Sequence, residues 1–324
     1  MDVVFLFDSI PWYAALMWVV VLAALIGFNE LTRRYRWAGI AIFIALPIIL
    51  TIFVWPTTAG EGSSTGSWFH WVKVYSALAG ALGFMALRYY PKLARNKFAL
   101  WFPPAILGLN ILEAVIRDFE VYGLEGMVDG VFMNGGPWNI MNGVAGILNL
   151  VTICGWAGIY ISRDKTKDMI WPDMLWFWII AYDLWNFAYV YNAVGDHAFY
   201  AGAALLISCT IPAFFIKRGA WLQHRASTLA LWMMFTMAFP AFASTSMFAV
   251  ETSRSETALF TVSLVSLLAN IAVVVYQVHV IVTRRRNPLK DELFTHLEAY
   301  KKVAAGRDLP MPDAGTSRRE PALV

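Results

Sequence analysis

Long apolar stretches, separated by short polar or Gly/Pro-containing segments, recur along nearly the whole chain. A membrane-spanning helix needs about 20 mostly apolar residues, and nine stretches meet this requirement. The pattern therefore predicts an all-α fold, a polytopic integral membrane bundle of about nine transmembrane helices. The expected spans are residues 11–29, 38–55, 68–88, 99–117, 139–162, 171–192, 197–216, 227–249 and 257–282.

The loops between these stretches alternate in charge. Lys and Arg are concentrated in every second loop and in the tail after the ninth stretch; of the 25 basic residues, only Lys73, Arg117 and Arg254 lie elsewhere. Because cytoplasmic loops carry the excess of Lys and Arg, we expect the N-terminus outside and the C-terminus inside. The expected location is a bacterial-type cytoplasmic (inner) membrane.

The composition agrees with a membrane protein, since 59% of the residues are hydrophobic and 15% are charged, against about 25% charged in a typical soluble domain. The net charge of +3 is too small to predict nucleic-acid binding. Cys154 and Cys209 lie inside apolar stretches without metal-type spacing. Residues 1–10 contain no Lys or Arg, so we expect the first stretch to remain as a span rather than act as a cleavable signal.

Two regions are predicted: a transmembrane bundle over residues 1–286 and a cytoplasmic juxtamembrane helix with a disordered tail over residues 287–324. Within the bundle, a shift of 70 residues aligns the helical hairpins 68–117 and 138–187 at a few positions, which suggests a weak internal repeat. The longest external loop, residues 119–137, could form a lid or a re-entrant segment.

Four ionisable side chains fall at membrane depth, where each costs a few kcal/mol to insert and is therefore a functional hypothesis. They are Lys73, Glu113, Arg117 and Asp183. Because successive helices alternate in direction, we expect all four to converge in the extracellular half of the bundle. Asp183 lies nearest the middle of its span and is the strongest candidate for a proton carrier.

Polar residues at helical spacing accompany these charges. Asn110 shares a helix face with Glu113 and Arg117, Asn186 follows Asp183 by three residues, and His70 lies one turn from Lys73. We therefore expect an outward-opening polar site between the third and sixth spans. Its predicted substrate- or ion-binding residues are Asp183, Glu113, Lys73, Arg117, Asn110, Asn142, Asn186 and His70. The alternative is that the two cations and two carboxylates form a structural ion-pair network, although apolar packing usually joins helices at less cost.

Several common motifs are absent. The sequence contains no Walker loop, G-x-S-x-G, H-E-x-x-H or dinucleotide fingerprint, and the ninth stretch has no lysine for a retinal. No cofactor or metal is therefore predicted. The stretch WFHWVKVYSALAGALGF, Trp68 to Phe84, resembles a group of bacterial multi-pass membrane proteins of unknown function. That resemblance implies a polytopic fold and no particular activity.

The leading hypothesis is a transporter or channel-like carrier for a small ion or solute, and not an enzyme. In it, Asp183 and Glu113 bind a cation or exchange protons, while Lys73 and Arg117 balance them or hold an anionic group. One alternative is a membrane-embedded enzyme for a lipid or lipid-linked substrate, with His70 or Asp183 as general base. Another is a sensor or assembly subunit. The expected partners are membrane lipids, the solute and a second copy in a homo-oligomer.

Overall fold

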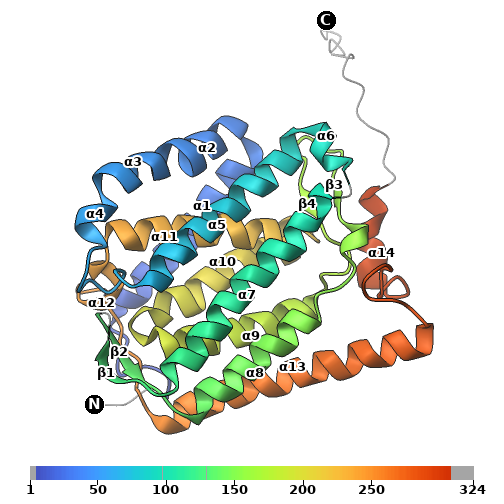
Figure 1. The fold of residues 1–324 in the computed structure, drawn as a ribbon. Coiled ribbons are helices and arrows are strands. Elements are labelled where there is room, and N and C mark those ends of the chain that lie inside the picture. The colour runs from blue at the N-terminus through green and yellow to red at the C-terminus, as the bar shows by residue number, and fades with distance from the viewer. Residues whose placement is uncertain (1–4, 97, 129, 308–324) are drawn as a thin grey trace, which may run out of the picture.

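The fold is a bundle of helices that lie side by side along roughly one direction (Figure 1). The computed structural model describes residues 5–96, 98–128 and 130–307. Within these residues, nine long helical segments follow one another in the order that the apolar stretches predict. They are α1 (Trp12–Arg34), Arg36–Phe53 with α2 (Arg36–Ile40) and α3 (Leu46–Phe53), α5 (Trp68–Tyr89), Ala99–Val121 with α7 (Phe102–Val121), α8 (Pro137–Val151), α9 (Trp176–Ala193), Gly195–Ile216 with α10 (Leu205–Ile211), α11 (Trp221–Ala238) and α13 (Glu256–Arg284).

Five of these segments are long and apolar enough to cross a membrane. They are Trp12–Arg34, Arg36–Phe53, Ala99–Val121, Gly195–Ile216 and Glu256–Arg284. A mostly helical chain with several membrane-type helices is thereby confirmed. The number of nine spans, their orientation and the hairpin repeat stay predictions.

Two of the predicted stretches differ most from the observed helices, for local backbone reasons. The stretch predicted over 139–162 ends as a helix at Val151, and the chain then turns at Gly155, whose φ is +67°. A short antiparallel pair, β3 (Tyr160–Ile161) with β4 (Met169–Ile170), follows. The stretch predicted over 227–249 forms α11 earlier and ends before Pro240, because proline has no N–H to continue the ladder.

The central helices pack in pairs: α5 against α7 and α11, α8 against α7 and α13, and α13 against α9. The segment with α2 and α3 covers one edge of the bundle, and α13 runs along the opposite edge (Figure 1). Both edge segments present large apolar side chains outward, such as Ile52 and Phe53 on α3 and Val282 on α13. Such extensive exposed apolar surface is expected of helices that face lipid.

The two ends of the bundle differ in structure (Figure 1). One end carries α4 (Trp55–Thr58), α12 (Ala241–Ser244) and the antiparallel pair of β1 (Glu125–Val128) with β2 (Val131–Asn134). This hairpin lies within the long loop 119–137, which was expected to form a lid or a re-entrant segment. The other end carries β3, β4, α6 (Pro91–Ala94) and α14 (Glu298–Ala304).

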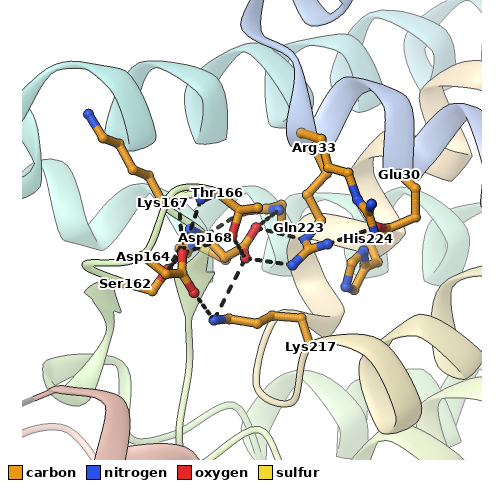
Figure 2. A network of polar contacts seen from close by, with 12 residues as sticks. Glu30, Arg33, Ser162, Asp164, Thr166, Lys167, Asp168, Lys217, Gln223 and His224 are labelled. Carbon is orange, nitrogen blue, oxygen red and sulfur yellow. Dashed lines mark hydrogen bonds and ion pairs between the residues drawn. The ribbon is translucent and has the colours of Figure 1, made fainter. Parts of the chain in front are cut away.

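A buried carboxylate anchors the β3–β4 loop between helices at this second end (Figure 2). Asp168 is 0% exposed and accepts two hydrogen bonds from Arg33, from Nε at 3.0 Å and from Nη2 at 3.1 Å. Gln223 Nε2 of α11 donates to it at 2.9 Å and Thr166 Oγ1 at 2.6 Å. One side chain therefore joins α1, α11 and the loop.

The ionisation of the loop acids follows from these contacts. Burial alone would raise the pKa of Asp168, but the charge of Arg33 and the hydrogen bonds outweigh it and hold the pKa below its ordinary value. The pKa of Asp164 is lowered to about 2, because the hydrogen bonds from Lys217, Thr166 and Ser162 likewise outweigh its burial. Both groups are therefore carboxylates at neutral pH.

The segment after α13 is docked on the bundle as far as residue 307. Leu293, Phe294 and Tyr300 are buried in a small apolar cluster that includes Cys154 and Leu175. The helix predicted at the start of this segment forms only at Glu298–Ala304, after a series of turns. The disordered tail was predicted within residues 287–324, and residues 308–324 lie outside the described part of the chain.

The side chain of Asp173 is hydrogen-bonded to the backbone of this docked segment. Its carboxylate accepts the N–H of Leu293 at 2.6 Å and the N–H of Phe294 at 3.1 Å. Burial raises the pKa of Asp173 to about 6, although these two hydrogen bonds oppose the shift. Farther along, Arg307 pairs with Glu292 at 2.6 Å.

Candidate functional site

A cavity of about 60 Å³ lies between α5, α7, α9, α11 and the segment Gly195–Ile216. Its wall combines apolar side chains with an unusual number of polar ones. The polar lining residues are His70, Lys73, Asn110, Tyr182, Asn186, Tyr189, His197, Arg225 and Thr236. Among the described residues that line it there are two permanent cations and no carboxylate, so the cavity has a positive character.

Lys73 is 7% exposed and its charge is balanced by a neighbour outside the cavity wall. Its Nζ lies 2.7 Å from Oε2 of Glu113 and donates a hydrogen bond to the carbonyl oxygen of Asn110 at 3.0 Å. Ser76 Oγ donates to the same Glu113 oxygen at 3.1 Å. This ion pair joins α5 to α7 and leaves Lys73 at the cavity surface as half of a neutral pair.

Arg225 is the other cation, and among the described residues no carboxylate lies within ion-pair distance of it, although Asp183 is near enough to interact with it electrostatically. It is 5% exposed; its Nη2 donates to Oδ1 of Asn186 at 3.1 Å and its Nε to the hydroxyl of Tyr182 at 3.4 Å. Among the described residues, no carboxylate forms an ion pair with it and no atom accepts a hydrogen bond from Nη1. A buried guanidinium without a directly paired carboxylate is costly, which favours a site for an anion.

Two histidines lie at the end of the cavity nearer the β1–β2 hairpin. Their rings are 5.8 Å apart between centroids, and Nδ1 of His70 is hydrogen-bonded to Ser67 Oγ at 2.8 Å. Nε2 of His197 and the hydroxyl of Tyr189 have no partner among the described residues. Together with Nη1 of Arg225, polar atoms of three lining residues therefore have no partner among the described residues and could bind a ligand or water.

Four of the eight residues singled out from the sequence line this cavity: His70, Lys73, Asn110 and Asn186. Glu113 contacts it through Lys73. The remaining three lie elsewhere.

Asp183 of α9 is not among the residues that line the cavity, and it accepts a hydrogen bond from Thr210 Oγ1 at 2.6 Å. Asn142 donates to Asp118 at 2.8 Å, in a separate buried cluster between α7 and α8. Arg117 pairs with Glu120 at 3.2 Å.

Sequence reasoning missed Arg225, because it counted this residue among the basic residues of a cytoplasmic loop. The helix α11 begins at Trp221, so Arg225 lies inside the bundle, one turn from the helix start. The available signal was the run Gln223-His224-Arg225 directly after an apolar Trp221-Leu222 pair, which marks polar residues within a helix. His197, which the sequence did not single out, also lines the cavity.

A second cavity, of about 30 Å³, adjoins the first. The two share Asn110, Tyr182, Arg225 and Leu229 in their linings. The second cavity extends along α5 to Gly80 and Phe84, away from His70 and toward the end with β3 and β4. Arg225 therefore lies between two cavities that follow one another along the bundle.

Comparisons with known proteins give one match. The model of one family fits residues 8–306, nearly the whole chain, and its description reads "Family of unknown function (DUF5692)". No curated protein and no solved structure matches the chain.

Proposed function

Since the chain belongs to this family of unknown function, we propose from its own residues that it is an integral membrane carrier for a small anionic solute. The observation that carries the proposal is the buried guanidinium of Arg225. It faces a cavity, has no carboxylate partner among the described residues and keeps Nη1 free of hydrogen bonds to them. An anion in the cavity would supply the missing counter-charge.

The size of the cavity limits the solute. Its volume of about 60 Å³ is well below the roughly 300–1,000 Å³ of pockets that bind drug-sized ligands. Small inorganic anions and short carboxylates fit this limit. Asn186 and Tyr182 hold the guanidinium in place, and a planar guanidinium binds carboxylates in a bidentate manner.

A carrier is favoured over a binding protein because Arg225 lies between two successive cavities. A solute held at Arg225 would be close to both, one toward each end of the bundle. Alternating closure of the two ends around such a central site is the usual arrangement of secondary transporters. Asp183, with one carboxylate oxygen bonded to Thr210 and the other without a partner among the described residues, is our candidate for proton coupling.

We also propose nine spans, with the N-terminus outside and the C-terminus inside a bacterial-type cytoplasmic membrane. The support is the chemistry of the loops. The end of the bundle with β3, β4 and α14 carries most Lys and Arg residues, whereas the end with β1 and β2 carries few. This orientation is tested with single cysteines placed at residues 126 and 290 of otherwise cysteine-free protein. A membrane-impermeant thiol reagent should label residue 126 in intact cells and residue 290 only after the cells are permeabilised.

The function is tested in two steps with purified protein. The first step measures thermal stabilisation by a panel of chloride, nitrate, phosphate, formate, acetate and lactate salts at constant ionic strength. The second measures uptake of each stabilising anion into proteoliposomes under an imposed proton gradient. We expect at least one anion to stabilise the protein and to be taken up.

Three variants separate the roles of the residues. We expect Arg225→Gln to lose both stabilisation and uptake, and Arg95→Gln, at an exposed arginine outside the cavities, to keep both. Asp183→Asn is expected to keep anion binding and to lose the response to the proton gradient. No anion effect on folded wild-type protein, or equal effects in Arg225→Gln, would show that the cavity is not an anion site.

A further inference from the structure

A pocket separate from the two cavities that Arg225 lines is found at the end of the bundle with β3, β4 and α14. Its volume is about 410 Å³. Three separate parts of the chain form it: the loop after β3, the end of the segment Gly195–Ile216 with the turn that follows, and α14. Its charged lining residues are Arg163, Asp164, Lys217, Arg218 and Lys302.

The charges of this pocket do not cancel. Asp164 forms an ion pair with Lys217, and its pKa of about 2 keeps it ionised, so these two side chains are neutral together. Neither Arg218 nor Lys302 forms an ion pair with a described carboxylate, so these two cations remain uncompensated by the described part of the chain. The described lining of the pocket therefore carries a net positive charge from Arg218 and Lys302, which suits a phosphate group.

Apolar surface directly adjoins these cations. Phe214, Phe215 and Ile216 line the same pocket, immediately before Lys217 and Arg218 in the chain. The side chain of Phe215 is 82% exposed. A large exposed aromatic ring beside basic residues at the end of a helix is typical of the boundary between hydrocarbon and lipid headgroups.

We propose that this pocket binds the phosphate of an anionic phospholipid, with the acyl chains lying against Phe215. The proposal rests on the membrane placement given above but not on the identity of the transported solute. A bound headgroup would contact the β3–β4 loop, the end of α10's segment and α14 at once. It would thereby hold the docked segment 287–307 at the membrane surface.

The test compares lipid binding by wild-type protein with that of a double variant, Arg218→Gln with Lys302→Gln. Native mass spectrometry of detergent-solubilised protein is titrated with phosphatidylglycerol, with phosphatidylcholine and with inorganic phosphate. The matched control is Lys92→Gln with Arg95→Gln, two exposed cations at the same end of the bundle and outside the pocket. Size-exclusion profiles establish that each protein is folded.

We expect wild type and control to bind phosphatidylglycerol in preference to phosphatidylcholine. The double variant should bind it about 20- to 30-fold more weakly, since each surface cation contributes roughly a fivefold factor to binding of an anionic lipid. Equal affinities of the double variant and the control would overturn the proposal. Binding of inorganic phosphate as tight as that of phosphatidylglycerol would overturn it too, because it would assign the pocket to a free anion.

Discussion

Replacement of Asp168 by alanine tests how the polar network of Figure 2 holds the bundle together. The substitution removes both hydrogen bonds to Arg33, at 3.0 and 3.1 Å, and leaves this 7% exposed guanidinium with Glu30 as its one remaining ion-pair partner among the described residues. Loss of one partner from a buried pair costs about 3–5 kcal/mol. Gln223 and Thr166 each lose an acceptor as well, at about 1 kcal/mol apiece.

The contact of Arg33 with Glu30 at 2.8 Å recovers part of this loss. We therefore expect the free energy of unfolding to fall by about 3–5 kcal/mol in Asp168→Ala. Asp168→Asn, which keeps the size and one acceptor oxygen, should fall between this variant and wild type. The assay is unfolding by sodium dodecyl sulfate in mixed micelles, followed by tryptophan fluorescence, with Glu298→Ala on the surface as the control that leaves stability unchanged.

The same network has a defined pH dependence. Because the folded state holds the pKa of Asp168 below its ordinary value, its stabilisation is complete above the pKa of the unfolded chain, about 4. The stabilisation is lost as the pH falls below that value toward the folded pKa, and Asp168→Asn should abolish this part of the acid sensitivity. A change in unfolding free energy below about 1 kcal/mol in Asp168→Ala would refute the view that the carboxylate joins the three elements.

Three further substitutions have defined outcomes. Arg225→Met should raise the free energy of unfolding by about 1 kcal/mol or more in the same assay, because it removes a buried charge that lacks a carboxylate partner among the described residues; a less stable protein would contradict this. Asp173→Ala should speed amide hydrogen exchange at Leu293 and Phe294, because their N–H groups lose their acceptor. In wild type the docking should weaken as the pH rises from about 4 through about 6, because the folded state raises the pKa of Asp173 to about 6. Unchanged exchange in the variant would count against the docking role. Gly155→Ala should cost at least about 1–2 kcal/mol of unfolding free energy, because φ is +67° and the added Cβ would lie 1.9 Å from Oδ2 of Asp173; a near-neutral effect would show that the turn can relax.

The apolar pattern was sufficient to predict the order of the helical segments, because a run of about 20 apolar residues leaves the backbone few alternatives to a helix. Helix ends were less predictable, since they depend on single residues. At Gly155 the backbone adopts a left-handed conformation, and at Pro240 it lacks a donor. Where α8 and α11 end is thus decided by local chemistry rather than by hydropathy.

Burial depth was a weaker guide to the candidate site. Depth alone singled out Asp183, but depth does not say which face of α9 a side chain occupies, and Asp183 contacts Thr210 rather than the cavity. Lys73 and Glu113 were expected at the same level, and they form an ion pair. Arg225 was missed because the rule for basic loops assigns a cation near a helix start to the loop, whereas the polar run from Gln223 to Arg225 lies within α11.

The docked segment 287–307 has a consequence for the order in which the protein is assembled. Cys154 and Leu175, in the connection between α8 and α9, are buried against Leu293 and Phe294, and Asp173 has its acceptors filled by the same segment. A ribosome delivers residues 287–307 only after all nine helical segments have been made. The connection between the fifth and sixth segments therefore cannot complete its packing until the ninth segment and the residues after it have been synthesised.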